Sequence, residues 1–144
     1  MSMLNKIGET LGKLDYVKAM TDVTGFGLLG HLSEMCEGSD LQALIEFEKV
    51  PRIMEIDEYL DQNSVPGGTN RNWASYGHKV KTISERQKHI MADPQTSGGL
   101  LVAVQEDKTA EFEQVLRDNG IPEKNIVCFG TLSERNGEKL IEVI

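Results

Sequence analysis

Glycine and polar residues concentrate in three short segments of this 144-residue sequence: 21–27 (TDVTGFG), 66–72 (PGGTNRN) and 93–99 (DPQTSGG). Glycine lets a backbone approach a ligand closely, while hydroxyl, amide and guanidinium groups donate hydrogen bonds to anions. The three segments are therefore the places where this chain could bind an anion such as phosphate.

The first segment carries a carboxylate beside groups that favour an anion. Asp22 ends a predicted strand. Thr24, Gly25 and Gly27 then precede a predicted helix, whose first backbone N–H groups lack partners within the helix. Asp22 would repel bare phosphate, but Mg²⁺ binds through one or two carboxylates plus substrate oxygens, so Asp22 could hold a metal ion while the other three bind phosphate. The alternative, which residue types alone favour, is that Asp22 or Thr24 only caps the helix.

The second segment offers an arginine between two asparagines. The planar guanidinium of Arg71 can hold a phosphate through two hydrogen bonds, and Asn70 and Asn72 are neutral donors beside it. We expect a long surface loop here, because residues 61–68 (DQNSVPGG) form the richest cluster of turn residues in the chain. The alternative is a solvated arginine on a flexible turn.

The third segment precedes an apolar run of strand length. Thr96, Ser97 and Gly98 could form a small nest of amides and hydroxyls around an anion, although the lysine of a Walker loop is absent. Alone, this segment is weak evidence for a site. We include its three residues as candidate ligands of the phosphates.

Apolar periodicity predicts regular elements around the three segments. A capping box is expected at Ser84 and Gln87, and Gly38 and Gly120 are expected to end helices. The pattern predicts an α+β fold, a layered α/β sandwich with helices packed on a mixed or antiparallel sheet, in a single domain over 1–144. The expected helices are 2–14 with Ser2 as N-cap, 27–37, one after Pro51, one after Ser84, and 107–119 with Asp107 as N-cap; the expected strands are 16–20, 41–50, 100–104, 126–129 and 140–144, the last two joined by a turn at 135–137.

Charge and hydropathy exclude several classes of partner. The formal net charge of −8 would repel a polyphosphate backbone, and no Lys/Arg cluster lies beside aromatic residues, which argues against nucleic acid. No stretch approaches the ~20 apolar residues of a membrane-spanning helix, and residues 1–6 (MSMLNK) lack a signal-peptide core. We therefore expect no membrane partner and a cytoplasmic location.

The cysteines and histidines offer little chemistry. Cys36 and Cys128 lie far apart without a CxxC partner, so we expect two buried free thiols rather than a disulfide or a zinc site. His31 borders the apolar stripe of the second helix, and His78 and His89 lack the spacing of metal ligands. We interpret all three histidines as structural.

Taken together and in order, TDVTGFGLLGHL (21–32), PGGT with Arg71 and Asn72, and DPQTSGGLL (93–101) closely resemble the carboxyl-terminal domain of selenophosphate synthetases, the selenide, water dikinase family. The resemblance covers nearly the whole chain. The first and third motifs occur in related form across the wider superfamily, which includes aminoimidazole ribonucleotide synthetase, thiamine monophosphate kinase and a hydrogenase maturation protein.

The resemblance implies the fold of an aminoimidazole ribonucleotide synthetase C-terminal domain and a role in a two-lobed, homodimeric enzyme. Such an enzyme makes selenophosphate, AMP and orthophosphate from ATP, selenide and water. It implies ATP and Mg²⁺ as cofactors and the N-terminal lobe of the same enzyme as partner. By similarity, Asp22 is one of the acidic side chains through which Mg²⁺ is held against the phosphates.

The sequence also departs from the family in what it lacks. The family's nucleophilic cysteine or selenocysteine and its lysine lie in a glycine-rich segment of the N-terminal lobe, and nothing here matches that segment; Cys36, on a predicted helix, is not that residue. We therefore expect no catalytic residue on this chain and no activity from it alone. Two alternatives stay open: the C-terminal lobe of another enzyme of the superfamily, or a stand-alone binding module.

Overall fold

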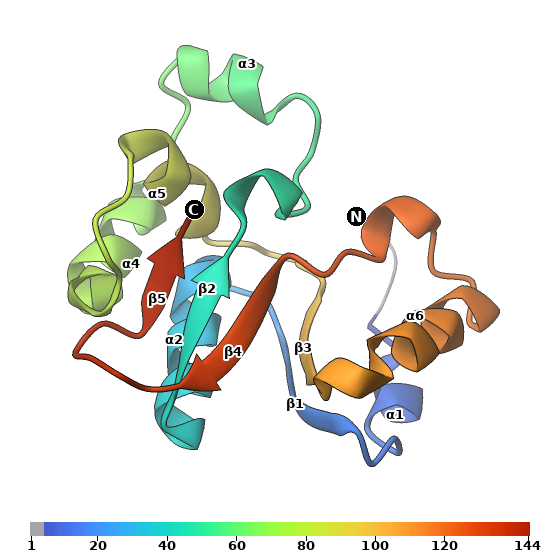
Figure 1. Cartoon of the computed structure of the whole chain (residues 1–144). Coiled ribbons are helices and arrows are strands. Elements are labelled where there is room, and N and C mark those ends of the chain that lie inside the picture. Colours follow the sequence, from blue (N-terminus) through green and yellow to red (C-terminus); the bar gives the residue numbers. More distant parts are fainter. Residues whose placement is uncertain (1–4) are drawn as a thin grey trace.

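The computed structural model describes residues 5–144, which form short helices and strands in two groups (Figure 1). One group is a ribbon of two strands, with a short helix and a longer amphipathic helix beside it. The other is a sheet of three strands with helices packed on it. The helices are α1 (Gly8–Leu11), α2 (Gly27–Ser39), α3 (Ile56–Asp61), α4 (Gly67–Tyr76), α5 (Glu85–Met91) and α6 (Thr109–Asp118), and the strands are β1 (Val17–Asp22), β2 (Leu41–Ile45), β3 (Leu100–Val104), β4 (Gly130–Glu134) and β5 (Ile141–Val143).

The two sheets have different topologies. β1 and β3 pair antiparallel, which sets Asp22 opposite Leu100 at one end of the ribbon. The other sheet has the order β4-β2-β5, in which β2 runs antiparallel to β4 and parallel to β5. Helices packed on a mixed and an antiparallel sheet confirm the α+β expectation.

The core lies between α2 and the three-stranded sheet, where α2 lies behind β2 in Figure 1. Leu29, Leu32 and Cys36 are spaced for one face of α2 and are 0%, 4% and 0% exposed. On β2, Ala43 and Ile45 face this stripe at alternate positions, the period of a strand. Amphipathic patterning along the sequence is thus what places α2, and with it the turn that precedes it.

Several predicted elements are confirmed, some with shifted bounds. β3 has the predicted bounds, and the capping box at Ser84 is present, with Ser84 N–H donating to Gln87 Oε1 over 2.8 Å. The first helix is only α1, and the expected N-cap Ser2 lies outside the described residues. The second helix passes Gly38 and ends at Ser39, with Asp40 as a left-handed C-cap at φ 53°.

Two strand predictions near the end of the chain are wrong. Residues 126–129 form no strand, and β4 begins instead at Gly130, where a Cβ would lie 2.5 Å from the carbonyl oxygen of Leu44. β4 and β5 do not form a hairpin either, because β2 lies between them and satisfies the backbone of both. Only glycine allows the approach at position 130, so local apolar character could not decide where the strand starts.

The predicted surface loop at 61–68 is also partly wrong. α4 begins at Gly67, directly after Pro66, and therefore takes in Asn70 and Arg71. The helix expected from Asp107 begins at Thr109, since residues 106–108 form a 3-10 turn. Cys128 is exposed, against the expectation of burial, while Cys36 is buried as predicted.

Within residues 5–144, no helix is both long enough and apolar enough to cross a membrane.

Candidate functional site

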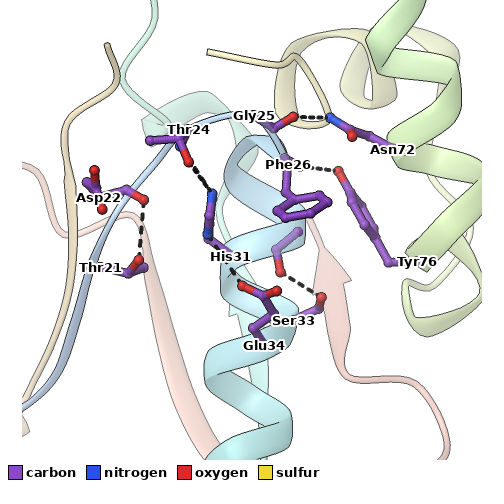
Figure 2. A network of polar contacts seen from close by, with 11 residues as sticks. Thr21, Asp22, Thr24, Gly25, Phe26, His31, Ser33, Glu34, Asn72 and Tyr76 are labelled. Atoms are coloured by element: carbon purple, nitrogen blue, oxygen red, sulfur yellow. Dashed lines mark hydrogen bonds and ion pairs between the residues drawn. The ribbon is translucent and has the colours of Figure 1, made fainter. Parts of the chain in front are cut away.

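The three glycine-bearing segments meet at the turn that precedes α2. Asn72 of α4 donates one hydrogen bond to the Gly25 carbonyl over 2.8 Å and another to the Ala92 carbonyl over 3.0 Å. The backbone N–H of Gln95 donates to the Thr24 carbonyl over 3.1 Å. Figure 2 shows Asn72 reaching the turn from α4. Segments separated in the sequence therefore form one structural unit.

Close backbone packing explains three of the glycines. Gly27 has φ +71°, and a Cβ there would lie 2.8 Å from the carbonyl oxygen of Asp93. A Cβ at Gly98 would overlap the carbonyl oxygen of Val23, and one at Gly68 would lie 2.7 Å from Pro94 Cγ. These glycines are needed for the segments to pack on one another, whatever else they contact.

Most backbone N–H groups of the first segment are already paired, which corrects the prediction that they are free. Thr24 N–H donates to His31 Nε2 over 3.1 Å, and Gly27 N–H donates to the Thr24 carbonyl over 3.0 Å. Residues 27–30 are buried, so the first turn of α2 faces protein rather than a ligand. Gly25 differs: it is exposed, and among the described residues its N–H has no acceptor.

Asp22 stands at the end of β1 with an exposed side chain. The capping alternative is wrong for both Asp22 and Thr24, because the N-cap of α2 is Phe26 and no side chain caps it. Within residues 5–144, no three His, Cys, Asp or Glu side chains gather to hold a metal ion. One free carboxylate fits Mg²⁺ only as a single ligand, to be completed by oxygens from elsewhere.

The other predicted ligands lie at the surface around this unit. Asn70 and Arg71 are exposed on the first turns of α4, and Thr96 and Ser97 are exposed in the third segment. Within residues 5–144, none of these four side chains forms a hydrogen bond with another residue. The structure therefore brings the backbones of the three segments together and leaves these four side chains open to a ligand.

Three residues organise the site in ways that the sequence did not reveal: Asn72 was predicted to be a donor to a ligand, His31 was interpreted only as structural, and Tyr76 was not singled out. His31 holds Thr24, Tyr76 donates to the Phe26 carbonyl over 2.6 Å, and Asn72 is 8% exposed and points inward rather than toward a ligand. Burial raises the pKa of Tyr76 far above its usual value, so the phenol stays protonated and donates. The signal was the four-residue spacing of Asn72 and Tyr76, which puts both on one helix face.

Asp93 is the first residue of the third segment, and its carboxyl group is half-buried. Burial raises the pKa of Asp93 above its ordinary value. Its backbone carbonyl lies against Gly27, so the side chain stands beside the same packed unit. The charged form of Asp93 is therefore partly desolvated beside the three packed segments.

Comparison with known proteins shows which family this chain belongs to. Residues 4–141 match the family described as "AIR synthase related protein, C-terminal domain". The chain is 53% identical over 144 residues to a protein of Pseudomonas putida named "Selenide, water dikinase", and 49% identical over 144 residues to one of the same name from Aeromonas hydrophila. In both cases all of this chain is covered, but only 41% of the relative. The chain thus belongs to the family of AIR synthase related protein C-terminal domains.

Proposed function

We propose that this chain is the C-terminal lobe of a selenide, water dikinase, an enzyme that makes selenophosphate, AMP and orthophosphate from ATP, selenide and water. The observation that carries the proposal is 53% identity to a relative of that name along all 144 residues, which include the three packed segments. Function in this fold class depends on the site rather than on the fold, so the site residues carry the rest of the argument.

In this proposal, Asp22 would supply one oxygen ligand to Mg²⁺, an ion whose chemistry here would be to neutralise charge on the phosphates of ATP. The support is its place at the end of a paired strand, with an exposed carboxylate that caps no helix. Mg²⁺ takes an octahedral shell of oxygens, so a single carboxylate holds it only with help from the phosphates and from another lobe. The isolated chain should bind Mg²⁺ weakly.

The surrounding groups are proposed to contact phosphate in different ways. Gly25 offers an open backbone N–H, and Arg71 offers an exposed guanidinium fork, with Asn70 beside it. Thr96 and Ser97 offer exposed hydroxyls. The remaining predicted ligands are proposed to contribute through the shape of the site, because neighbouring segments pack against their backbones. These residues are Thr24, Gly27 and Gly98.

The nucleophile is proposed to come from the N-terminal lobe, together with most of the ATP site and the contacts of a homodimer. Cys36 is 0% exposed, and burial, followed by the charge of Glu37, raises the pKa of its thiol to about 11, which disfavours the thiolate. The chain by itself therefore should not form AMP from ATP and selenide. A cytoplasmic location is part of the same proposal.

The test is to fuse the chain behind the N-terminal part of the Pseudomonas putida relative and to compare Asp22→Asn with Asp15→Asn. Both substitutions remove one exposed carboxylate, at opposite ends of the β1 region. We expect Asp22→Asn to lose most selenophosphate formation with an unchanged melting temperature, and Asp15→Asn to keep it. Unchanged activity in Asp22→Asn, or a loss explained by unfolding, would reject the metal role.

A further inference from the structure

His31 joins the turn before α2 to the helix itself. Its side chain is 11% exposed, and its Nε2 lies 3.1 Å from both the backbone nitrogen and the Oγ1 of Thr24. On the opposite side of the ring, Nδ1 lies 3.5 Å from Glu34 Oε2. Figure 2 shows the imidazole between Thr24 and Glu34.

The hydrogen-bond partners define the tautomer of this ring. A backbone N–H can only donate, so His31 Nε2 must be unprotonated to accept from Thr24. A neutral imidazole then carries its proton on Nδ1, on the side of the Glu34 carboxylate. The edge contact with the Phe26 ring, at 5.9 Å between centroids and 69° between planes, further limits rotation of the imidazole.

Both backbone polar groups of Thr24 are held by hydrogen bonds. Its N–H is held by His31, and its carbonyl accepts from the N–H groups of Gly27 and Gln95. Gly25 follows Thr24 directly, whereas the backbone of Asp22, two residues earlier, is held independently by pairing with Leu100 and by the Val23 N–H, which donates to the Gly99 carbonyl over 2.9 Å. Release of the Thr24 N–H would therefore loosen the turn at Gly25, while Asp22 stays in place.

We propose that His31 is a positioning residue, which in its Nδ1–H tautomer fixes Thr24 and thereby holds the adjacent Gly25 N–H in position to bind phosphate. The importance of that position rests on the proposed contact of Gly25 with phosphate. The histidine acts through Thr24 and touches neither metal nor phosphate.

The first test needs no ligand and uses the 144-residue chain. ¹⁵N NMR should show His31 with an unprotonated Nε2 and a protonated Nδ1. Hydrogen exchange at the Thr24 amide should be about tenfold faster in His31→Phe, which fills the space without an acceptor. In His31→Gln, whose amide oxygen can replace Nε2, it should stay near the original rate. His78→Phe, at an exposed histidine, is the matched control and should change nothing.

Two results would overturn the proposal at this stage. One is a protonated Nε2 in the unsubstituted chain, a measurement that holds even if His31→Phe fails to fold. The other is an unchanged Thr24 exchange rate in a folded His31→Phe.

The second test separates this inference from the proposed function. In the fused protein, His31→Phe should raise the ATP concentration for half-maximal activity, and His31→Gln should restore it. An unchanged ATP requirement, with activity still lost in Asp22→Asn, overturns positioning and leaves the role of Asp22 intact. Full activity in Asp22→Asn overturns the proposed function, whatever the His31 variants do.

Discussion

The Tyr76 hydroxyl donates a 2.6 Å hydrogen bond to the carbonyl oxygen of Phe26, fifty residues earlier in the chain. This bond connects the end of α4 to the turn before α2, as Figure 2 shows. Because the phenol is buried and protonated, its loss would leave the Phe26 carbonyl without that donor. Helix α4 is thus part of the framework of the site as well as a carrier of Arg71.

Tyr76→Phe should destabilise the chain by about 1–2 kcal/mol through loss of this hydrogen bond. Tyr59→Phe is the control, because Tyr59 is 51% exposed on α3. Urea unfolding followed by circular dichroism would measure both. Equal midpoints for the two variants would contradict a stabilising role of the Tyr76 bond.

Two glycines of α2 should respond to alanine with opposite signs. At Gly30 a Cβ would lie 2.6 Å from Phe26 Cβ and 2.9 Å from Tyr76 Cε1, so Gly30→Ala should cost about 1–3 kcal/mol. At Gly38 nothing lies within 4 Å, so Gly38→Ala should stabilise by about 0.5–1 kcal/mol through helix propensity. The melting temperatures of the two variants should move apart, and a shared direction would count against the packing at Gly30.

The two cysteines should differ in reactivity toward a thiol-alkylating reagent. Cys128 is exposed, whereas Cys36 is buried and has a pKa raised to about 11. Mass spectrometry should find Cys128 alkylated within the native protein and Cys36 alkylated only after unfolding. Rapid native modification of Cys36 would show that the face of α2 opens easily.

Asp93 should make stability depend on pH. Its folded pKa is raised by burial, so below the ordinary value of about 4 both states are protonated and no penalty exists. As pH rises through the window from that value to the folded pKa, the unfolded state ionises first and stability falls. Asp93→Asn should lack this loss, so its advantage in unfolding midpoint should grow between about pH 4 and neutral pH. An advantage independent of pH would point to another cause.

Local sequence patterns predicted much of the fold. The apolar run of β3 and the capping box at Ser84 are signals read within a few residues, and both were confirmed. The order β4-β2-β5 was not predictable in that way, because it depends on which distant strand pairs with β2. α4 was missed because Gly67 and Gly68 disfavour a helix locally, whereas Pro94 packs on Gly68 and Asn72 bonds the neighbouring segments.

The motifs indicated where the candidate site lies, but they did not indicate the role of each residue in it. The three segments do meet, at the turn before α2. Yet Gly27 and Gly98 allow segments to pack, and the amide of Thr24 is taken by His31. Residue type alone does not distinguish a glycine near a ligand from a glycine near another backbone.

The parallel pairing of β5 with β2 also sets the order in which the chain can fold. Residues 141–143 pair with 43–45, and Phe47 N–H donates to the Ile144 carbonyl. During synthesis, β2 is made nearly a hundred residues before the strand that covers this edge. Until then, Ala43 and Ile45 lie in a strand open to pairing with other chains. The nascent chain should therefore be prone to aggregate in the interval between the emergence of β2 and that of β5.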